Sequence, residues 1–227
     1  MDKTTSPTVG VRFTAEFIGT YILVATLIIA YFMTLLSGGN ALLYALSYGA
    51  TLAVLIAVFQ GWSYQFNPIV SLVAFITRQQ TLPHLGAAFL GQVLGAVLAS
   101  RTVVGLTNMV PTINAQVPAV DAAGLSLTMI TALEGFGILL LLLAYIWGNR
   151  SENSTHLPLI AGLSVIPGSA LAVFVSGGAL NPVRVLGPAF FMGSAWKSMW
   201  VFWVGPIVAA LVAVIIMGFL MKNRQNS

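Results

Sequence analysis

The side chains with the clearest chemical potential in this sequence are two asparagines, each followed by a proline. Asn67-Pro68 and Asn181-Pro182 lie in stretches that are otherwise almost wholly apolar. Asparagine is a favoured helix N-cap, and proline is favoured at the first helical position. Each pair therefore predicts the start of a helix that the asparagine carbonyl oxygen caps. The NH₂ group of each asparagine is then left as a hydrogen-bond donor.

Three charged side chains inside apolar segments are the other candidates for function. Arg184 follows the second Asn-Pro pair, while Glu16 lies 51 residues before Asn67 and Glu134 lies 47 residues before Asn181. Carboxylates in such segments can act as proton relays, or as buried acceptors for backbone N–H groups. The matched places of the two glutamates in the two halves of the chain favour structural acceptors.

The composition places these side chains inside a lipid bilayer. Of the 227 residues, 58% are hydrophobic and only 6% are charged, whereas a soluble domain carries about a quarter charged residues. This excludes a soluble enzyme and a nucleic-acid-binding protein, and no cofactor or metal site is expected. Six segments are long and apolar enough to span a bilayer as helices, namely 14–36, 42–60, 84–106, 126–147, 157–176 and 199–221.

Two further apolar stretches, 68–77 and 182–193, are too short to span, and each begins at an Asn-Pro pair. Each predicts a re-entrant half-helix, which is tolerated only where it is buried in protein or lines a watery cavity. The order of two spans, a half-helix and a third span occurs in about 12–106 and again in about 126–222. Three spans is an odd number, so the copies form an inverted repeat. We expect one membrane channel domain, 1–227.

Half-helices that enter from opposite sides bring their N-termini together near the bilayer midplane. Each N-terminus carries roughly half a positive charge from the aligned peptide dipoles. Cations and hydronium are repelled there, while two amide donors orient the oxygen of a water molecule and interrupt a chain of proton transfer. The arrangement predicts a passive channel for water that excludes protons and ions. A coupled secondary transporter and a non-conducting adhesive protein are the alternatives of a different class.

The basic residues predict the orientation of the chain, because cytoplasmic loops collect Lys and Arg. Placing both termini in the cytoplasm gathers most of them on that side, namely Lys3, Arg12, Arg78, Arg150, Lys222 and Arg224. The predicted outer loop at 107–126 contains no Lys or Arg. We expect a multi-pass protein of the plasma membrane with both termini cytoplasmic.

On these motifs the chain resembles the major intrinsic protein family, the aquaporins and aquaglyceroporins. The resemblance runs from AEFIGT (15–20) through FNPIVSL (66–72) and GQVLGA (91–96) to GGALNPVRVLGPAFF (177–191). It implies an aquaporin-like all-α fold, one pore per subunit of a homotetramer, and a narrow selectivity filter outside the asparagine pair. It also implies a second candidate function, a channel that passes small neutral solutes such as glycerol, urea or ammonia.

The resemblance assigns four residues of this chain to the selectivity filter. They are Arg184, Gly178, Ser169 and an aromatic residue of the second span, for which the Tyr48-Gly pair is preferred over the strictly spaced Ser47. Ser169 stands where strict water channels usually carry histidine. Because Ser169 and Gly178 are small, the neck of the pore is expected to be wider than in those channels.

The chain departs from the family pattern at three more positions. Val185 follows the filter arginine, where typical glycerol channels carry aspartate, and this argues against a dedicated glycerol channel. Ile69 and Val183 replace the alanine of the usual Asn-Pro-Ala triplets. These changes leave the solute and the pore width open, but the dipole argument stands because both Asn-Pro pairs are present.

Overall fold

The fold is a bundle of helices in a computed structural model that describes residues 7–107, 125–150, 152–191 and 193–225. Its six long apolar helices are α1 (Val9–Leu36), α2 (Ala41–Phe59), α4 (Leu82–Thr107), α5 (Leu127–Gly148), α6 (Leu157–Ser176) and α8 (Val201–Gln225). Its short elements are α3 (Pro68–Ile76), α7 (Pro182–Ala189) and the 3₁₀ turns η1 (Ser154–His156) and η2 (Gly193–Ser198). This confirms the predicted fold class of six spanning helices and two half-helices.

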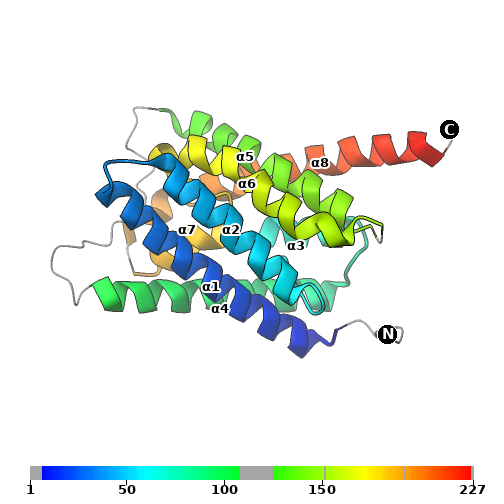
Figure 1. The fold of residues 1–227 in the computed structure, drawn as a ribbon, viewed down its shortest axis with the longest axis horizontal. Coiled ribbons are helices and arrows are strands. Elements are labelled where there is room, and N and C mark those ends of the chain that lie inside the picture. Colours follow the sequence, from blue (N-terminus) through cyan, green and yellow to red (C-terminus); the bar gives the residue numbers. More distant parts are fainter. Residues whose placement is uncertain (1–6, 108–124, 151, 192, 226–227) are drawn as a thin grey trace.

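The long helices enclose the two short ones. α1 packs against α4 and α5 packs against α8, while α2 contacts α6 across the bundle. Figure 1 shows α3 in the half of the bundle where α1 begins and α8 ends, and α7 in the opposite half. The half-helices contact each other between these halves. Each therefore reaches the middle of the molecule from its own end.

Glycines in α4 allow α1 to pack at backbone distance. A Cβ added at Gly91 would lie 2.6 Å from the carbonyl oxygen of Phe13, and one at Gly95 would lie 2.5 Å from that of Phe17. Real Cβ atoms do not approach this closely, so the G-x-x-x-G spacing is what permits the contact. The α1–α4 pair is thereby held tightly on one side of α3.

The half-helix α7 ends at Ala189, earlier than the predicted end at residue 193. Pro188 lies in the last turn of α7 and has no backbone N–H, so the bond back to the carbonyl oxygen of Arg184 is missing and this turn is weakened. The N–H of Phe191 instead bonds to the carbonyl oxygen of Pro188 in a tighter turn. The apolar residues beyond Ala189 therefore belong to the connection to η2.

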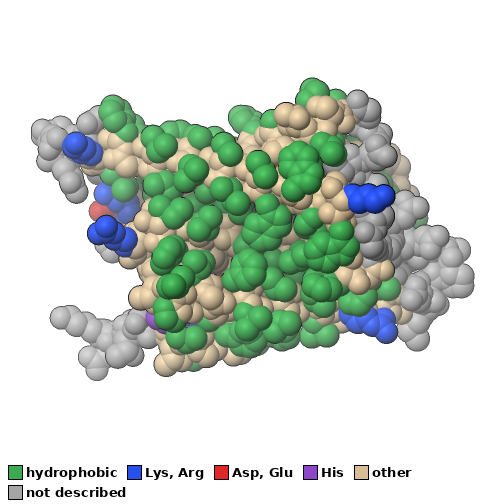
Figure 2. Space-filling view, turned by 180° about the vertical axis from the view of Figure 1, so that it is seen from behind, with side chains coloured by type: hydrophobic (Ala, Val, Ile, Leu, Met, Phe, Trp, Pro, Cys, Tyr) green, Lys and Arg blue, Asp and Glu red, His purple; other side chains and the backbone are tan. Residues whose placement is uncertain are grey.

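The outer surface is an apolar band between two charged ends. Figure 2 shows hydrophobic side chains over the middle of the molecule, with Lys and Arg confined to its two ends. Large hydrophobic side chains of the long helices are well exposed, among them Phe136, Leu171, Ile215 and Phe219, each at least 65% accessible. Such a surface suits lipid rather than water, so the chain is an integral, multi-pass membrane protein.

Candidate functional site

The half-helices α3 and α7 both start at an asparagine whose side chain caps its own helix. Oδ1 of Asn67 accepts the N–H of Ile69 at 3.0 Å, and Oδ1 of Asn181 accepts the N–H of Val183 at 3.2 Å. A proline follows each asparagine at the first helical position. The caps are those that the sequence predicts, and they leave the NH₂ groups for other partners.

Each asparagine also bonds to the loop that leads into the opposite half-helix. Nδ2 of Asn67 donates to the carbonyl oxygen of Leu180 at 2.9 Å, and Nδ2 of Asn181 donates to that of Phe66 at 2.7 Å. Since an NH₂ group has two hydrogens, each asparagine keeps one further donor. The two N-termini are therefore joined directly, and we call this arrangement of Phe66, Asn67, Leu180 and Asn181 the half-helix junction.

Two buried glutamates accept hydrogen bonds from backbone N–H groups of this junction. Glu16 accepts the N–H of Phe66 at 2.7 Å, and Glu134 accepts the N–H of Leu180 at 2.8 Å. Both carboxylates are fully enclosed by protein. Further donors to the same carboxylates are Ser63 Oγ, Gln65 N and Gln92 Nε2 for Glu16, and Ser176 Oγ for Glu134. The glutamates thus act as acceptors for backbone N–H groups of the half-helix loops.

The residues before the two asparagines have a strained backbone. Phe66 has φ of +50° and Leu180 has φ of +46°, a left-handed conformation that costs a residue with a side chain roughly 1–2 kcal/mol. Hydrogen bonds on both sides stabilise it, because a glutamate binds each N–H and an asparagine of the other half binds each carbonyl oxygen. In this conformation the N–H of each residue bonds to a glutamate while its carbonyl oxygen bonds to the asparagine of the opposite half-helix.

Two glycines make room for these strained residues. A Cβ added at Gly19 would lie 2.0 Å from Cε1 of Phe66, and one added at Gly137 would lie 2.5 Å from Cδ2 of Leu180. Each glycine comes three residues after a junction glutamate. One turn of α1 and one turn of α5 therefore supply both the acceptor and the space that a half-helix loop needs.

Arg184 in α7 lies against two tyrosines. Its Cζ is 5.3 Å from the ring centroid of Tyr44 and 5.6 Å from that of Tyr31. The arginine is only 2% exposed, and its Nε has no hydrogen-bond partner among the described residues. Cation–π attraction stabilises a guanidinium in this setting by about 0.5–2 kcal/mol. The tyrosines thus hold a permanent positive charge inside the bundle.

Gly178 faces Tyr44 rather than open space. Tyr44 donates its hydroxyl to the carbonyl oxygen of Gly178 at 3.1 Å, and a Cβ added at Gly178 would lie 2.9 Å from Cε1 of that ring. The hydroxyl of Ser169 donates to Val165 of its own helix at 2.7 Å. Tyr44 therefore occupies the space beside the glycine, while the wider neck expected from the two small residues stays a prediction.

The structure places both candidates for the second-span residue. Tyr48 is buried and its hydroxyl donates to the carbonyl oxygen of Ala179 at 3.4 Å. Ser47 is half-buried and its hydroxyl donates to Leu43 in its own helix. Tyr48 therefore lies beside the loop that leads to α7, but the ring in contact with Arg184 is that of Tyr44.

Sequence reasoning missed Tyr44 and Tyr31. Tyr44 precedes Tyr48 by four residues, which puts both rings on one face of a helix, so the spacing could have identified it. Tyr31 lies in α1, far along the chain from the second Asn-Pro pair, and no motif marks it. Its place beside Arg184 depends on how α1 packs in the bundle.

Comparison with known proteins identifies the family to which this architecture belongs. A family model described as "Major intrinsic protein" matches residues 3–217, nearly the whole chain. The chain belongs to the major intrinsic protein family. Members of this family are membrane channels that pass water and small solutes, and they are not enzymes.

Relatives within the major intrinsic protein family include proteins named as aquaporins and a protein named as a glycerol uptake facilitator. The chain is 32% identical over 228 residues to Aquaporin A of Dictyostelium discoideum, covering 93% of this chain and 79% of that one. It is 29% identical over 211 residues to Glycerol uptake facilitator protein-like 6 of Lactiplantibacillus plantarum, covering 89% and 94%. Its fold is similar to the aquaglyceroporin of Plasmodium falciparum, with a TM-score of 0.76 and 24% identity over 91% and 94%.

Proposed function

We propose that the protein is a passive water channel that excludes protons and ions. The observation that carries this proposal is the half-helix junction, where two asparagine amides and two helix N-termini meet inside the bundle. The positive ends of both helix dipoles repel a cation. The remaining N–H of each asparagine can donate to the oxygen of a passing water molecule, which prevents that molecule from relaying a proton through this point.

Enclosure of the polar residues favours water over larger solutes. Asn67, Asn181 and Arg184 are each at most 3% exposed, which supports little room beside them for a solute larger than water. Tyr44 and Tyr31 close the space around the arginine. The alternative, a channel that also passes glycerol, urea or ammonia, draws on the name of the bacterial relative.

We assign the outer selectivity filter to Arg184, Gly178, Ser169 and Tyr44, with Tyr48 one turn further along the same helix face. Arg184 supplies a fixed positive charge and hydrogen-bond donors to the solute. The contacts of Tyr44 with both Arg184 and Gly178 support its place beside them.

Both chain ends are proposed to face the cytoplasm of the cell that carries the protein in its plasma membrane. Figure 1 shows the start of α1 and the end of α8 at the same end of the bundle. Arg12 lies in the first turn of α1 and Lys222 in the last turns of α8, which agrees with the positive-inside rule. The chain is further proposed to assemble as a homotetramer, as the family resemblance implies.

The proposed function is tested by the relative permeability of water, glycerol and urea through the purified protein in lipid vesicles. We expect fast water flux, with glycerol and urea close to the rates of bare lipid. Glycerol flux comparable to that of water would establish the alternative channel. Solute flux that follows an imposed proton gradient would indicate a coupled transporter, and water flux equal to bare lipid would indicate a non-conducting protein.

Replacing Arg184 with valine is expected to raise glycerol and urea permeability several-fold while water flux persists. The substitution removes the fixed charge and much of the side-chain volume beside the two tyrosine rings. Stopped-flow light scattering on vesicles measures all three rates. An unchanged solute profile would show that the filter is elsewhere.

Replacing Tyr44 with alanine is expected to raise glycerol permeability more than replacing Tyr48 with alanine. Tyr44 contacts both Arg184 and Gly178, whereas Tyr48 reaches only the carbonyl oxygen of Ala179 at a long distance. The two variants are matched in chemistry, helix and burial, so the comparison isolates position. A larger rise in glycerol permeability for Tyr48→Ala than for Tyr44→Ala would assign the filter position to Tyr48.

A further inference from the structure

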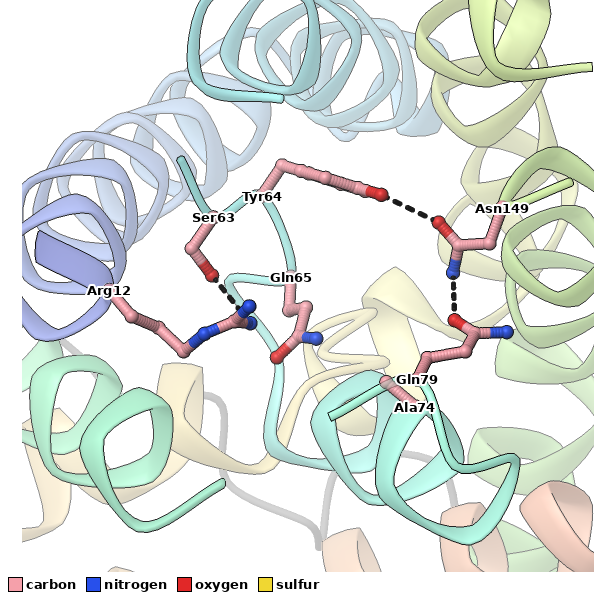
Figure 3. Close-up of a pocket in the computed structure, with 7 residues that line it drawn as sticks. All are labelled: Arg12, Ser63, Tyr64, Gln65, Ala74, Gln79 and Asn149. Carbon is pink, nitrogen blue, oxygen red and sulfur yellow. Dashed lines mark hydrogen bonds between the residues drawn. The ribbon is translucent and has the colours of Figure 1, made fainter. Parts of the chain in front are cut away.

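A polar cavity of about 220 Å³ lies in the half of the bundle that contains α3. The residues that line it are Arg12, Ser63, Tyr64, Gln65, Ala74, Gln79 and Asn149. We call this cavity the inner chamber (Figure 3). Its residues 63–65 directly precede the junction residues Phe66 and Asn67. The inner chamber therefore adjoins the half-helix junction on the side opposite to Arg184.

One side of the inner chamber is closed by a chain of hydrogen bonds. The hydroxyl of Tyr64 donates to Oδ1 of Asn149 at 2.7 Å, and Nδ2 of Asn149 donates to Oε1 of Gln79 at 2.7 Å. Figure 3 shows these three side chains as an arc from the loop before α3, through the end of α5, to the segment after α3. We call Tyr64, Asn149 and Gln79 the strap.

The strap is anchored at its first member. Tyr145 in α5 donates its hydroxyl to the carbonyl oxygen of Tyr64. The rings of these two tyrosines stack with centroids 6.3 Å apart and planes 11° apart. The aromatic ring of Tyr64 is therefore fixed by packing, while its hydroxyl alone makes the bond to Asn149.

The other side of the inner chamber carries polar atoms without partners. Nη1 of Arg12 donates to Oε1 of Gln80 at 3.0 Å, and Nε2 of Gln65 donates to the same oxygen at 3.2 Å. In the described part of the chain, Nε of Arg12 and Oε1 of Gln65 have no hydrogen-bond partner, although Gln65 is only 8% exposed. A buried polar atom left unpaired costs about 1–3 kcal/mol.

The polar side chains of Arg12, Gln65, Tyr64 and Asn149 line the inner chamber, and such groups can exchange hydrogen bonds with a hydroxyl group or a water molecule, which both accepts and donates. The charge of Arg12 makes the site unfavourable for a cation. Figure 3 shows Arg12 and Gln65 facing the space that the strap bounds. A small neutral hydroxylated molecule is therefore the chemistry that fits the inner chamber.

We propose that the inner chamber is a second selectivity site and that the strap limits the size of the solute that crosses it. The proposal rests on the proposed function as a channel. A single water molecule exchanges hydrogen bonds with Arg12 and Gln65 without displacing the strap. A glycerol molecule, with three carbons and three hydroxyls, passes only when the bonds of Asn149 to Tyr64 and Gln79 open.

The test compares glycerol and water permeability of vesicles that contain the Tyr64→Phe or the Asn149→Ala variant. Tyr64→Phe removes one hydroxyl and keeps the stacked ring, whereas Asn149→Ala removes both bonds of the strap. We expect the glycerol-to-water ratio to rise about fivefold in Tyr64→Phe, the size of effect that one hydrogen bond supplies, and to rise further in Asn149→Ala, which loses both bonds. Asn153→Ala is the matched control, because Asn153 donates to Trp147 instead, and its ratio should equal that of the unmodified protein.

A second measurement tests whether the inner chamber lies on the conduction path. The chain contains no cysteine, so Gln65→Cys introduces a single thiol that an organic mercurial can block. We expect the mercurial to remove most of the water flux of Gln65→Cys and none of the flux of Asn153→Cys.

The proposal is overturned if the strap variants keep the original glycerol-to-water ratio, or change both rates in parallel, while the unmodified protein conducts water. Water flux through Gln65→Cys that resists the mercurial overturns it as well. These outcomes leave the proposed function intact. Vesicles of the unmodified protein that conduct no better than bare lipid overturn both proposals.

Discussion

Replacing Gly19 with alanine is expected to abolish most of the water flux, although the change adds a single methyl group. The new Cβ would lie 2.0 Å from Cε1 of Phe66. That ring is fully buried and packs edge-on against Phe59, with centroids 5.8 Å apart. Phe66 must shift, and its carbonyl oxygen is the acceptor for Asn181 in the half-helix junction. Water permeability of reconstituted vesicles measures the loss.

Substitutions at two other glycines provide the comparison for the water flux of Gly19→Ala. Gly137→Ala brings a Cβ within 2.5 Å of a terminal methyl of Leu180, which yields more easily than an aromatic ring, so we expect a partial loss. Gly10→Ala places its Cβ where no described atom lies within 4 Å, so water flux should be unchanged. Forced overpacking typically costs about 1–3 kcal/mol. Equal flux in all three variants would show that the junction does not depend on this space.

Replacing Glu16 with alanine is expected to destabilise the protein more than any other single removal of a charge. It leaves the N–H groups of Gln65 and Phe66 without their acceptor in a site closed to water, and it removes one of the two acceptors of the Gln92 amide. Each such buried donor costs about 1–3 kcal/mol. Thermal unfolding of the detergent-solubilised protein measures the effect, with a lower midpoint expected for Glu16→Ala than for the unmodified chain.

The other glutamates provide the comparison for that measurement. Glu134→Ala frees Leu180 N and Ser176 Oγ, so its unfolding midpoint should fall as well, but less. Glu152→Ala removes an exposed side chain, 3.6 Å from Arg150, and such surface pairs contribute about 0–1 kcal/mol. A midpoint for Glu16→Ala as high as that for Glu152→Ala would contradict the structural role of the buried carboxylate.

The main features of the half-helix junction were predictable from local sequence. Asn-Pro at the start of a short apolar stretch predicts a capped half-helix, and both caps are present. The recurrence of Glu16 and Glu134 at matched places predicted buried acceptors, because two spans with one carboxylate each hold too few titratable groups for a relay. Short-range sequence patterns such as these predict local structure without knowledge of how the helices pack.

The place of Tyr31 beside Arg184 and the residues of the inner chamber could not be predicted from such local patterns. Tyr31 meets Arg184 only because the fold brings a residue of α1 next to one of α7, 153 residues apart in the chain. The strap joins Tyr64, Gln79 and Asn149, whose spacing follows no helical period. The small size of Gly178 likewise gives no sign of the tyrosine ring that packs against it.

The most direct test of the central claim measures water flux and proton flux together in the same vesicles. Purified protein is reconstituted with a pH-sensitive dye inside, and an osmotic step and a pH step are applied in separate stopped-flow runs. We predict water permeability well above that of protein-free vesicles, with proton flux equal to theirs. Water permeability that matches bare lipid, or proton flux that rises with the amount of protein, would contradict a junction of opposed half-helices that passes water alone.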